Sequence, residues 1–191
     1  MQSRTHPVYR YSLIAIILHW VMAVAFILMI GSGLAFENWE GMPQDLKFNV
    51  IQWHKSLGIL LLISFFIRLG IRLIKPPPPQ EPDLSQFDRK AAKGLHWLFY
   101  VIMIVMPLSG WIMVSSSSYG LPTYIFGLFE WPHIPSLSAN REVRGLSGEI
   151  HKIVAYVFIV MIMIHVGAVI KHYIFERLNL LPRMGIGKTR S

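Results

Sequence analysis

Two histidines in one apolar run are the residues of this sequence that point most clearly to chemistry. His151 and His165 lie fourteen residues apart within residues 150–173. In an α-helix this spacing returns to within about 40° of the same face, and the rise per residue separates the imidazoles by about 21 Å. That distance is most of a hydrocarbon layer about 30 Å thick. We therefore expect one helix to present a histidine near each membrane surface, and both histidines to face partners on other helices.

Depth in the membrane indicates those partners. His19 lies about as far from its end of the first apolar run as His165 lies from the same-side end of the last, so the two share a level. His54 and His151 each lie in the first turn or two of a helix that starts at the opposite surface, and they share the other level. His96 is on the same side of the membrane as His19 but about 8–9 Å shallower by helix rise, so it is a weaker candidate than His19 to pair with His165. The pattern predicts two depth-matched histidine pairs.

A b haem is the cofactor that such pairs favour. Ionisable residues inside a bilayer are costly and usually functional. Two histidines on opposite sides of an iron give the six-coordinate ligation of an electron-transferring b haem. Zinc prefers four ligands, often carboxylates or thiolates, and the apolar part of each predicted span holds no acidic residue. The chain has no cysteine, so both haems would be non-covalent. The alternatives are histidines that hydrogen-bond between helices and a proton or metal path in a transporter.

Two further residues fall at the levels of the histidine pairs. Gly33 is fourteen residues after His19, on the same face and at the level of the pair formed by His54 and His151. A missing side chain there would let a porphyrin approach the backbone, and close helix packing is the alternative role. Arg68 is fourteen residues after His54, at the level of the pair formed by His19 and His165. We expect it either to bind a haem propionate or to extend toward the cytoplasm.

Other polar residues flank the predicted haem levels. His172 lies seven residues after His165, on nearly the same face of the last helix. It would suit the proton uptake that accompanies quinone reduction, or it anchors the helix end. Lys55 and Lys152 each directly follow a histidine of the His54–His151 pair, and Arg141 and Arg144 precede the last helix. These cations are candidates for contacts with outer propionates or with an anionic substrate.

Composition places these residues in an integral membrane protein. Of 191 residues, 53% are hydrophobic, and the mean hydropathy is +0.47. That is too apolar for an ordinary soluble domain and long enough for four spans. We predict an all-α integral membrane four-helix bundle, formed by one domain over residues 1–191. Its helices are expected at about 11–36, 50–74, 94–114 and 148–175.

Charge indicates topology rather than a nucleic-acid partner. The net charge is +8, but the basic residues lie beside apolar runs, so lipid is the expected environment and no nucleic acid is expected. Most of the 18 Lys and Arg residues lie in the N-terminus, the connection between the second and third spans, and the C-terminal tail. The positive-inside rule then puts both termini in the cytoplasm of a multi-pass bacterial inner (cell) membrane protein. The aromatic-rich residues 115–148 would form an irregular loop on the periplasmic interface, where a redox protein partner would dock.

Short motifs lie along nearly the whole chain. They are Ile17-Leu18-His19-Trp20, then Trp53-His54-Lys55-Ser56 with Arg68 and Arg72, the proline stop at residues 76–79, His96, Tyr100 and Pro107, and finally His151, His165 and His172-Tyr173. Each short segment alone would be weak, and the set is specific. Together they resemble the bacterial cytochrome b561 family of four-helix di-haem membrane cytochromes.

The resemblance implies the same two histidine pairs as haem ligands. It also implies electron transfer across the membrane, and one similar member is a superoxide oxidase that passes electrons from superoxide to ubiquinone. This chain would then be a superoxide:quinone oxidoreductase, with quinone reduced near His172. One departure weakens the quinone assignment, because a lysine of that member's quinone site falls near Asp83 here. The alternative is a haem b membrane anchor that relays electrons between quinone and a separate redox protein, such as a hydrogenase or soluble cytochrome.

Overall fold

Four long helices form the body of the protein. The computed structural model describes residues 9–187, and residues 1–8 and 188–191 lie outside that range. The helices are α1 (Leu13–Asn38), α2 (Gln44–Ile74), α3 (Gln86–Ser115) and α4 (Arg141–Ile174). Their 26 to 34 residues correspond to about 39–51 Å. Each is long and apolar enough to cross a membrane, which confirms the prediction of an all-α four-helix membrane bundle.

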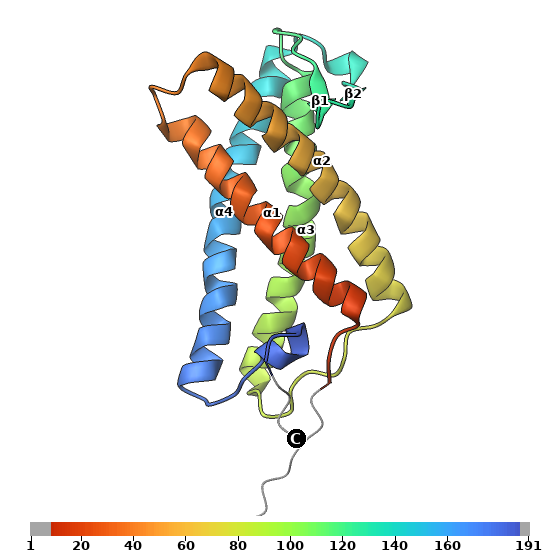
Figure 1. The fold of residues 1–191 in the computed structure, drawn as a ribbon, viewed down its shortest axis with the longest axis vertical. Helices are drawn as coiled ribbons and strands as arrows, with labels where there is room; N and C mark the ends of the chain where they lie inside the picture. The colour runs from red at the N-terminus through yellow and green to blue at the C-terminus, as the bar shows by residue number, and fades with distance from the viewer. Residues whose placement is uncertain (1–8, 188–191) are drawn as a thin grey trace, which may run out of the picture.

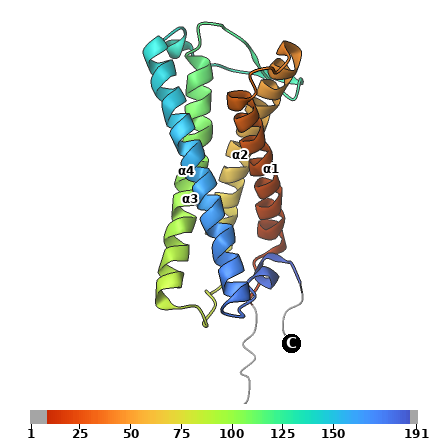
Figure 2. The same cartoon turned by 90° about the vertical axis from the view of Figure 1, so that its left-hand side faces the viewer.

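The helices are arranged as two packed pairs. α1 packs against α2, α3 packs against α4, and α2 joins the pairs through α3. Figure 2 shows α3 and α4 on one side of the bundle and α1 and α2 on the other. Buried side chains such as Phe65, Met103 and Phe158 fill the middle of the bundle. Large apolar side chains such as Leu13, Ile27 and Ile153 are exposed on the outside, where lipid would cover them.

Three helices begin earlier than hydropathy predicts. α2, α3 and α4 each start about two turns before the expected positions 50, 94 and 148. Local capping explains two of these starts. The Ser85 hydroxyl accepts the Asp88 amide at the start of α3, and the Asn140 side chain accepts the Val143 amide at the start of α4. These first turns are polar, so a hydropathy pattern does not detect them.

The connection after α3 contains a small β-hairpin where an irregular loop was predicted. β1 (Thr123–Ile125) pairs antiparallel with β2 (Phe129–Trp131), and the short helix η1 (Pro135–Leu137) follows. Phe126 and Gly127 have positive φ angles, as the tight turn between the strands requires.

The hairpin is fixed to the side of α2. Lys55 donates to the Pro122 carbonyl, and Ser56 donates to the Tyr124 carbonyl while it accepts the Phe126 amide. Gln52, one turn before Ser56 on α2, also donates to the Pro122 carbonyl, so one face of α2 holds β1. We call this end of the bundle the hairpin end (Figure 1).

The opposite end, which we call the terminus end, holds both ends of the described chain (Figure 1). The short helix η2 (Leu181–Met184) packs there, and Trp20 donates to the Met184 carbonyl. Arg183 is buried, forms an ion pair with Glu81 and donates to the Pro79 carbonyl. The C-terminal segment is therefore bound both to α1 and to the connection between α2 and α3.

Candidate functional site

The structure brings the four predicted ligand histidines together in two pairs. His54 of α2 and His151 of α4 face each other toward the hairpin end, with ring centres 6.3 Å apart. His19 of α1 and His165 of α4 face each other toward the terminus end, with ring centres 6.4 Å apart. α4 thus contributes one histidine to each pair. The pairing by depth and the structure agree on which rings meet.

The separation of the rings in each pair leaves room for one metal ion. A metal–imidazole nitrogen bond is about 2.0–2.1 Å and a ring centre lies about 1.1 Å behind its nitrogen, so two rings on opposite sides of a metal have centres about 6.2–6.4 Å apart. Two imidazoles joined by a direct hydrogen bond of about 2.9 Å would have centres about 5.1 Å apart. The observed 6.3 and 6.4 Å match the first arrangement in length, and they also lie within the 4.5–7 Å range of edge-to-face ring contacts, the geometry of both pairs.

A serine fixes the ring of His54. The Nδ1 atom of His54 lies 2.8 Å from the Ser32 hydroxyl oxygen, and that hydroxyl donates its hydrogen to the Met29 carbonyl at 3.0 Å. A hydroxyl has one hydrogen, so Nδ1 of His54 must be the donor in the first contact. The lone pair of this imidazole is then on Nε2, the nitrogen available to a metal.

His151 is held in the same tautomer by a backbone carbonyl. Its Nδ1 lies 3.0 Å from the Met106 carbonyl oxygen, which can only accept, and 3.1 Å from the Ser109 hydroxyl. Gly110 leaves space for the ring, because a Cβ there would lie 3.1 Å from Cε1 of His151. At Gly33 the corresponding Cβ would lie an ordinary 3.7 Å from His54.

An apolar cavity surrounds the hairpin-end pair. It has a volume of about 370 Å³ and is lined by all four helices and by the hairpin. This volume falls in the usual range for cofactor sites of about 300–1,000 Å³. Gly33 and Gly110 line it together with the two histidines.

The predicted lysines also line this cavity, and both already have protein partners. Lys55 donates to the Pro122 carbonyl of the hairpin at 2.9 Å. Lys152 forms an ion pair with Glu37 at 2.6 Å, with both side chains half exposed. The charge of Lys152 is therefore offset by Glu37, whereas Lys55 has only a neutral carbonyl as its partner at the edge of the cavity.

The terminus-end pair has a third histidine beside it. The ring centre of His96 is 5.8 Å from that of His165, so His96 lies closer to this pair than its depth in the sequence indicated. The guanidinium of Arg68 is near both His19 and His96. The rings and the guanidinium form one basic cluster within the bundle.

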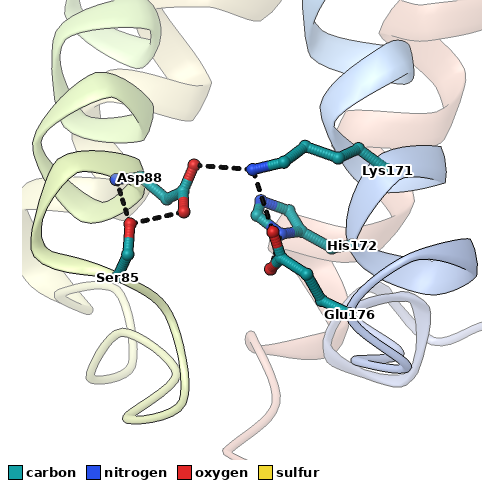
Figure 3. Close-up of polar contacts among 5 residues, drawn as sticks. All are labelled: Ser85, Asp88, Lys171, His172 and Glu176. Carbon is teal, nitrogen blue, oxygen red and sulfur yellow. Dashed lines mark hydrogen bonds and ion pairs between the residues drawn. The ribbon is translucent and has the colours of Figure 1, made fainter.

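His172 belongs to a polar cluster at the terminus end of α4 (Figure 3). Its ring is buried, and Nδ1 lies 2.6 Å from a carboxylate oxygen of Glu176. Lys171 bridges Glu176 at 2.9 Å and Asp88 of α3 at 3.2 Å, and Ser85 bonds to Asp88. The hydrogen bond from Lys171, followed by that from His172, lowers the pKa of Glu176 below its usual value. The cluster links a buried imidazole to the exposed carboxylate of Glu176 and to the partly buried carboxylate of Asp88.

The comparison with known protein families assigns the chain. The model of the family described as prokaryotic cytochrome b561 matches residues 10–187. The chain belongs to this family. The resemblance read from its motifs is confirmed.

Three similar proteins have comparable lengths. Cytochrome b561 homolog 2 of Escherichia coli K12 is 29% identical, and the match covers 99% of this chain and 97% of that protein. Cytochrome b561 homolog 1 of the same strain is 25% identical, with 92% and 96% covered. A protein named probable superoxide oxidase CybB, from Yersinia pestis, is 27% identical, with 92% and 95% covered.

Family membership and the four apolar helices establish a multi-pass bacterial membrane protein that binds b haem and transfers electrons. Two orphaned donors fit the carboxylates of such a haem. Among residues 9–187, the buried side-chain nitrogens without a partner are Nη1 of Arg68 and Nε1 of Trp131. Arg68 lies by His19, and Trp131 lines the cavity at the other pair. A buried unpaired donor is costly, so each is suited to a propionate oxygen of the cytochrome's cofactor.

Sequence reasoning missed several of these residues. Trp131 lies in a connection without helical periodicity, so nothing in the sequence placed it in the cavity. Ser32 and Ser109 are ordinary small residues until the helices bring them to a histidine. Glu176 could have been predicted most easily from the sequence, because it lies four residues after His172 and that spacing brings helical side chains together.

Proposed function

We propose that this cytochrome b561 holds two non-covalent b haems and carries electrons across the membrane from superoxide to ubiquinone. His54 and His151 would ligate one haem, and His19 and His165 the other. The observation that carries the proposal is the presence of two histidine pairs at metal-spanning separation, 6.3 and 6.4 Å, near opposite ends of one bundle. The fourteen residues between the two histidines of α4 set the pairs about 21 Å apart along that helix.

We infer that the hairpin end faces the periplasm and both termini face the cytoplasm. The distribution of Lys and Arg supports this orientation, because most of them lie at the terminus end. From here on, outer means the hairpin end and inner means the terminus end. A protease added to intact spheroplasts would then cleave the hairpin and spare a tag at either terminus. Cleavage of the terminal tags would reverse the orientation.

The reaction balances as two superoxide anions giving two electrons and two molecules of dioxygen, while one quinone takes two electrons and two protons to become quinol. Bound haem supplies the one-electron chemistry that joins these half-reactions. The chain's own residues hold and orient it. The paired histidines ligate, Arg68 and Trp131 bind carboxylates, and the apolar cavity walls exclude water.

Proton delivery to quinone is the role we assign to His172. Its ring is buried at the inner end of α4, where a quinone head group from the membrane would arrive. Nε2 would give its proton to a reduced quinone oxygen, and Nδ1 is bonded to Glu176 for resupply. Glu176 is exposed, so it exchanges protons with water directly. The buried ring and the exposed carboxylate thus form a two-step proton path.

A cationic cavity beside the outer pair supports a small anionic donor. This cavity has a volume of about 510 Å³ and is lined by Arg141, Arg144, Tyr119 and Glu149. Gly148 lines both this cavity and the one around the outer histidines, so the two spaces are neighbours. Two arginines against one glutamate leave a positive charge that attracts superoxide. The relative named probable superoxide oxidase supports the same donor.

The second candidate function is a relay between quinone and a separate redox protein. The connection after α3 favours it, because Tyr119, Leu128 and Phe129 are exposed there. A patch of this kind is typical of a transient docking surface.

One reaction separates the two candidates. Protein purified in detergent with both haems is mixed with a pulse of superoxide and with a ubiquinone analogue, and quinol is followed by absorbance. We expect quinol to form much faster than superoxide dismutates spontaneously, and added superoxide dismutase to abolish it. A His133→Ala variant, altered in the hairpin connection, serves as the control and should match the wild type. A fully haem-loaded sample that forms no quinol would contradict the superoxide assignment and favour the relay.

A further inference from the structure

The two histidine pairs differ in what their rings contact. Nδ1 of His54 donates to the Ser32 hydroxyl at 2.8 Å. Nδ1 of His151 donates to the Met106 carbonyl at 3.0 Å, with the Ser109 hydroxyl at 3.1 Å. Among the described residues, the structure shows no comparable serine contact for the two inner ligands. The outer pair alone has this serine support.

Donation from Nδ1 changes the iron that Nε2 would bind. A hydrogen bond from the far nitrogen leaves more electron density on the ligating nitrogen, which becomes a stronger base. A stronger base stabilises the more positive, ferric state over the ferrous state. The outer contacts therefore lower the reduction potential at the outer site.

The charges near the inner pair act in the opposite direction. Arg68 is near His19, and its Nη1 is buried with no partner among residues 9–187. The guanidinium of Arg72 lies 5.4 Å above the Tyr100 ring, at the same end. Positive charge in a medium of low dielectric constant favours the less positive, ferrous iron and raises the potential.

The cations at the outer end weaken this contrast only in part. Lys152 is paired with Glu37 at 2.6 Å, so its charge is offset. The ammonium group of Lys55 is bonded to the hairpin carbonyl at the cavity edge. Arg141 and Arg144 line the neighbouring cavity, where Glu149 offsets part of their charge. At the inner end, Nη1 of Arg68 is buried, so this charge acts in a medium of lower dielectric constant.

We propose that Ser32 and Ser109 are positioning residues that set the outer haem at a lower potential than the inner haem, so that electrons move inward downhill. The inference rests on the proposed two-haem function and adds its direction. Of the two serines, Ser32 is expected to matter more, because His151 keeps the Met106 carbonyl when Ser109 is removed. The donor at the hairpin end must then have a potential at or below that of the outer haem, and the step from the outer to the inner haem is downhill.

The experiment is a potentiometric titration of the haem absorption bands in purified holoprotein. The Ser32→Ala variant should raise the lower of the two midpoint potentials and leave the higher one in place. The Ser109→Ala variant should produce a smaller rise of the same potential. Ser147→Ala is the matched control, since this buried α4 serine bonds only to backbone carbonyls of its own helix. An unmoved lower potential in Ser32→Ala, or a shift of the higher one instead, would overturn the proposal.

Single-haem variants identify which site has which potential. His54→Ala should leave one haem that titrates at the higher potential, and His19→Ala should leave one at the lower potential. If His54→Ala leaves the lower potential, the assignment is reversed and the proposal fails. Should either variant not fold, the serine variants test the proposal alone.

Failure of this inference is distinguishable from failure of the proposed function. A haem count of two per chain in the wild type tests the ligand assignment before any potential is measured. A protein with two haems and active quinone reduction, but with serine variants that move neither potential, would retain the function and lose the inference. A shift of the lower potential in a protein that ignores superoxide would retain the inference and change only the donor.

Discussion

Replacing Gly110 by alanine should weaken haem binding at the outer site specifically. The added Cβ would lie 3.1 Å from Cε1 and 3.3 Å from Nδ1 of His151, so this ring must move by a few tenths of an ångström. Its hydrogen bond to Met106 and its aim at the iron depend on its present position. Overpacking of this kind costs about 1–3 kcal/mol. We therefore expect an affinity loss of about 5–150-fold for one of the two haems.

The assay follows haem loss from purified protein to excess apomyoglobin through the Soret band. Gly31→Ala is the matched control, because a Cβ there would have nothing within 4 Å and Gly31 does not line the cavity. Both substitutions favour the helix by about 1 kcal/mol, so a difference between them reports the contact with the histidine. We expect one haem to leave faster in Gly110→Ala and neither in Gly31→Ala. Wild-type retention in Gly110→Ala, or greater loss in Gly31→Ala, would contradict a role for the contact with His151.

Three further predictions follow from the inner end of the bundle. His172→Ala should retain both haems and slow quinone reduction, while superoxide still reduces the haems at the wild-type rate in stopped-flow spectra; loss of a haem would make His172 structural. Arg183→Ala should lower thermal stability by about 1–3 kcal/mol, because the carboxylate of Glu81 and the proline carbonyls lose their buried donor; an unchanged melting temperature would contradict the anchoring role. The pKa of Glu176 is held below its usual 4.5, chiefly by Lys171. The ion pairs of Glu176 therefore stabilise the fold above pH 4.5, and this stabilisation is lost as the pH falls through the lowered pKa. Glu176→Gln should flatten this acid-side dependence of the melting temperature, and an unaltered pH profile would contradict the stabilising role of these ion pairs.

Much of the haem-site architecture follows from spacing alone. His151 and His165 are fourteen residues apart, close to a whole number of helical turns, and this fixes their common face before any tertiary contact is known. Membrane thickness then limits the depth of each partner. For that reason the two depth-matched pairs meet in the structure, whereas the approach of His96 to His165 was not predicted by depth. Their role as ligands stays a prediction.

Other features depend on information that hydropathy does not carry. The early start of α4 depends on the side chain of Asn140, which caps a polar turn outside the apolar stretch. The hairpin depends on the contacts of Ser56 with strands nearly 70 residues away. Trp131 reaches the outer cavity only because β2 is fixed there. Contacts between distant segments produce each of these, so a single sequence read in order does not predict them.

Two bis-histidine b haems are expected at the two levels of the bundle, and a pyridine haemochrome count on single variants would establish or exclude them. The wild type should contain two b haems per chain. His54→Ala and His151→Ala should each retain one haem with the same spectrum and potential, and His19→Ala and His165→Ala should each retain the other. A wild type with fewer than two haems after expression with ample haem, or His54→Ala and His19→Ala losing the same haem, would contradict this expectation.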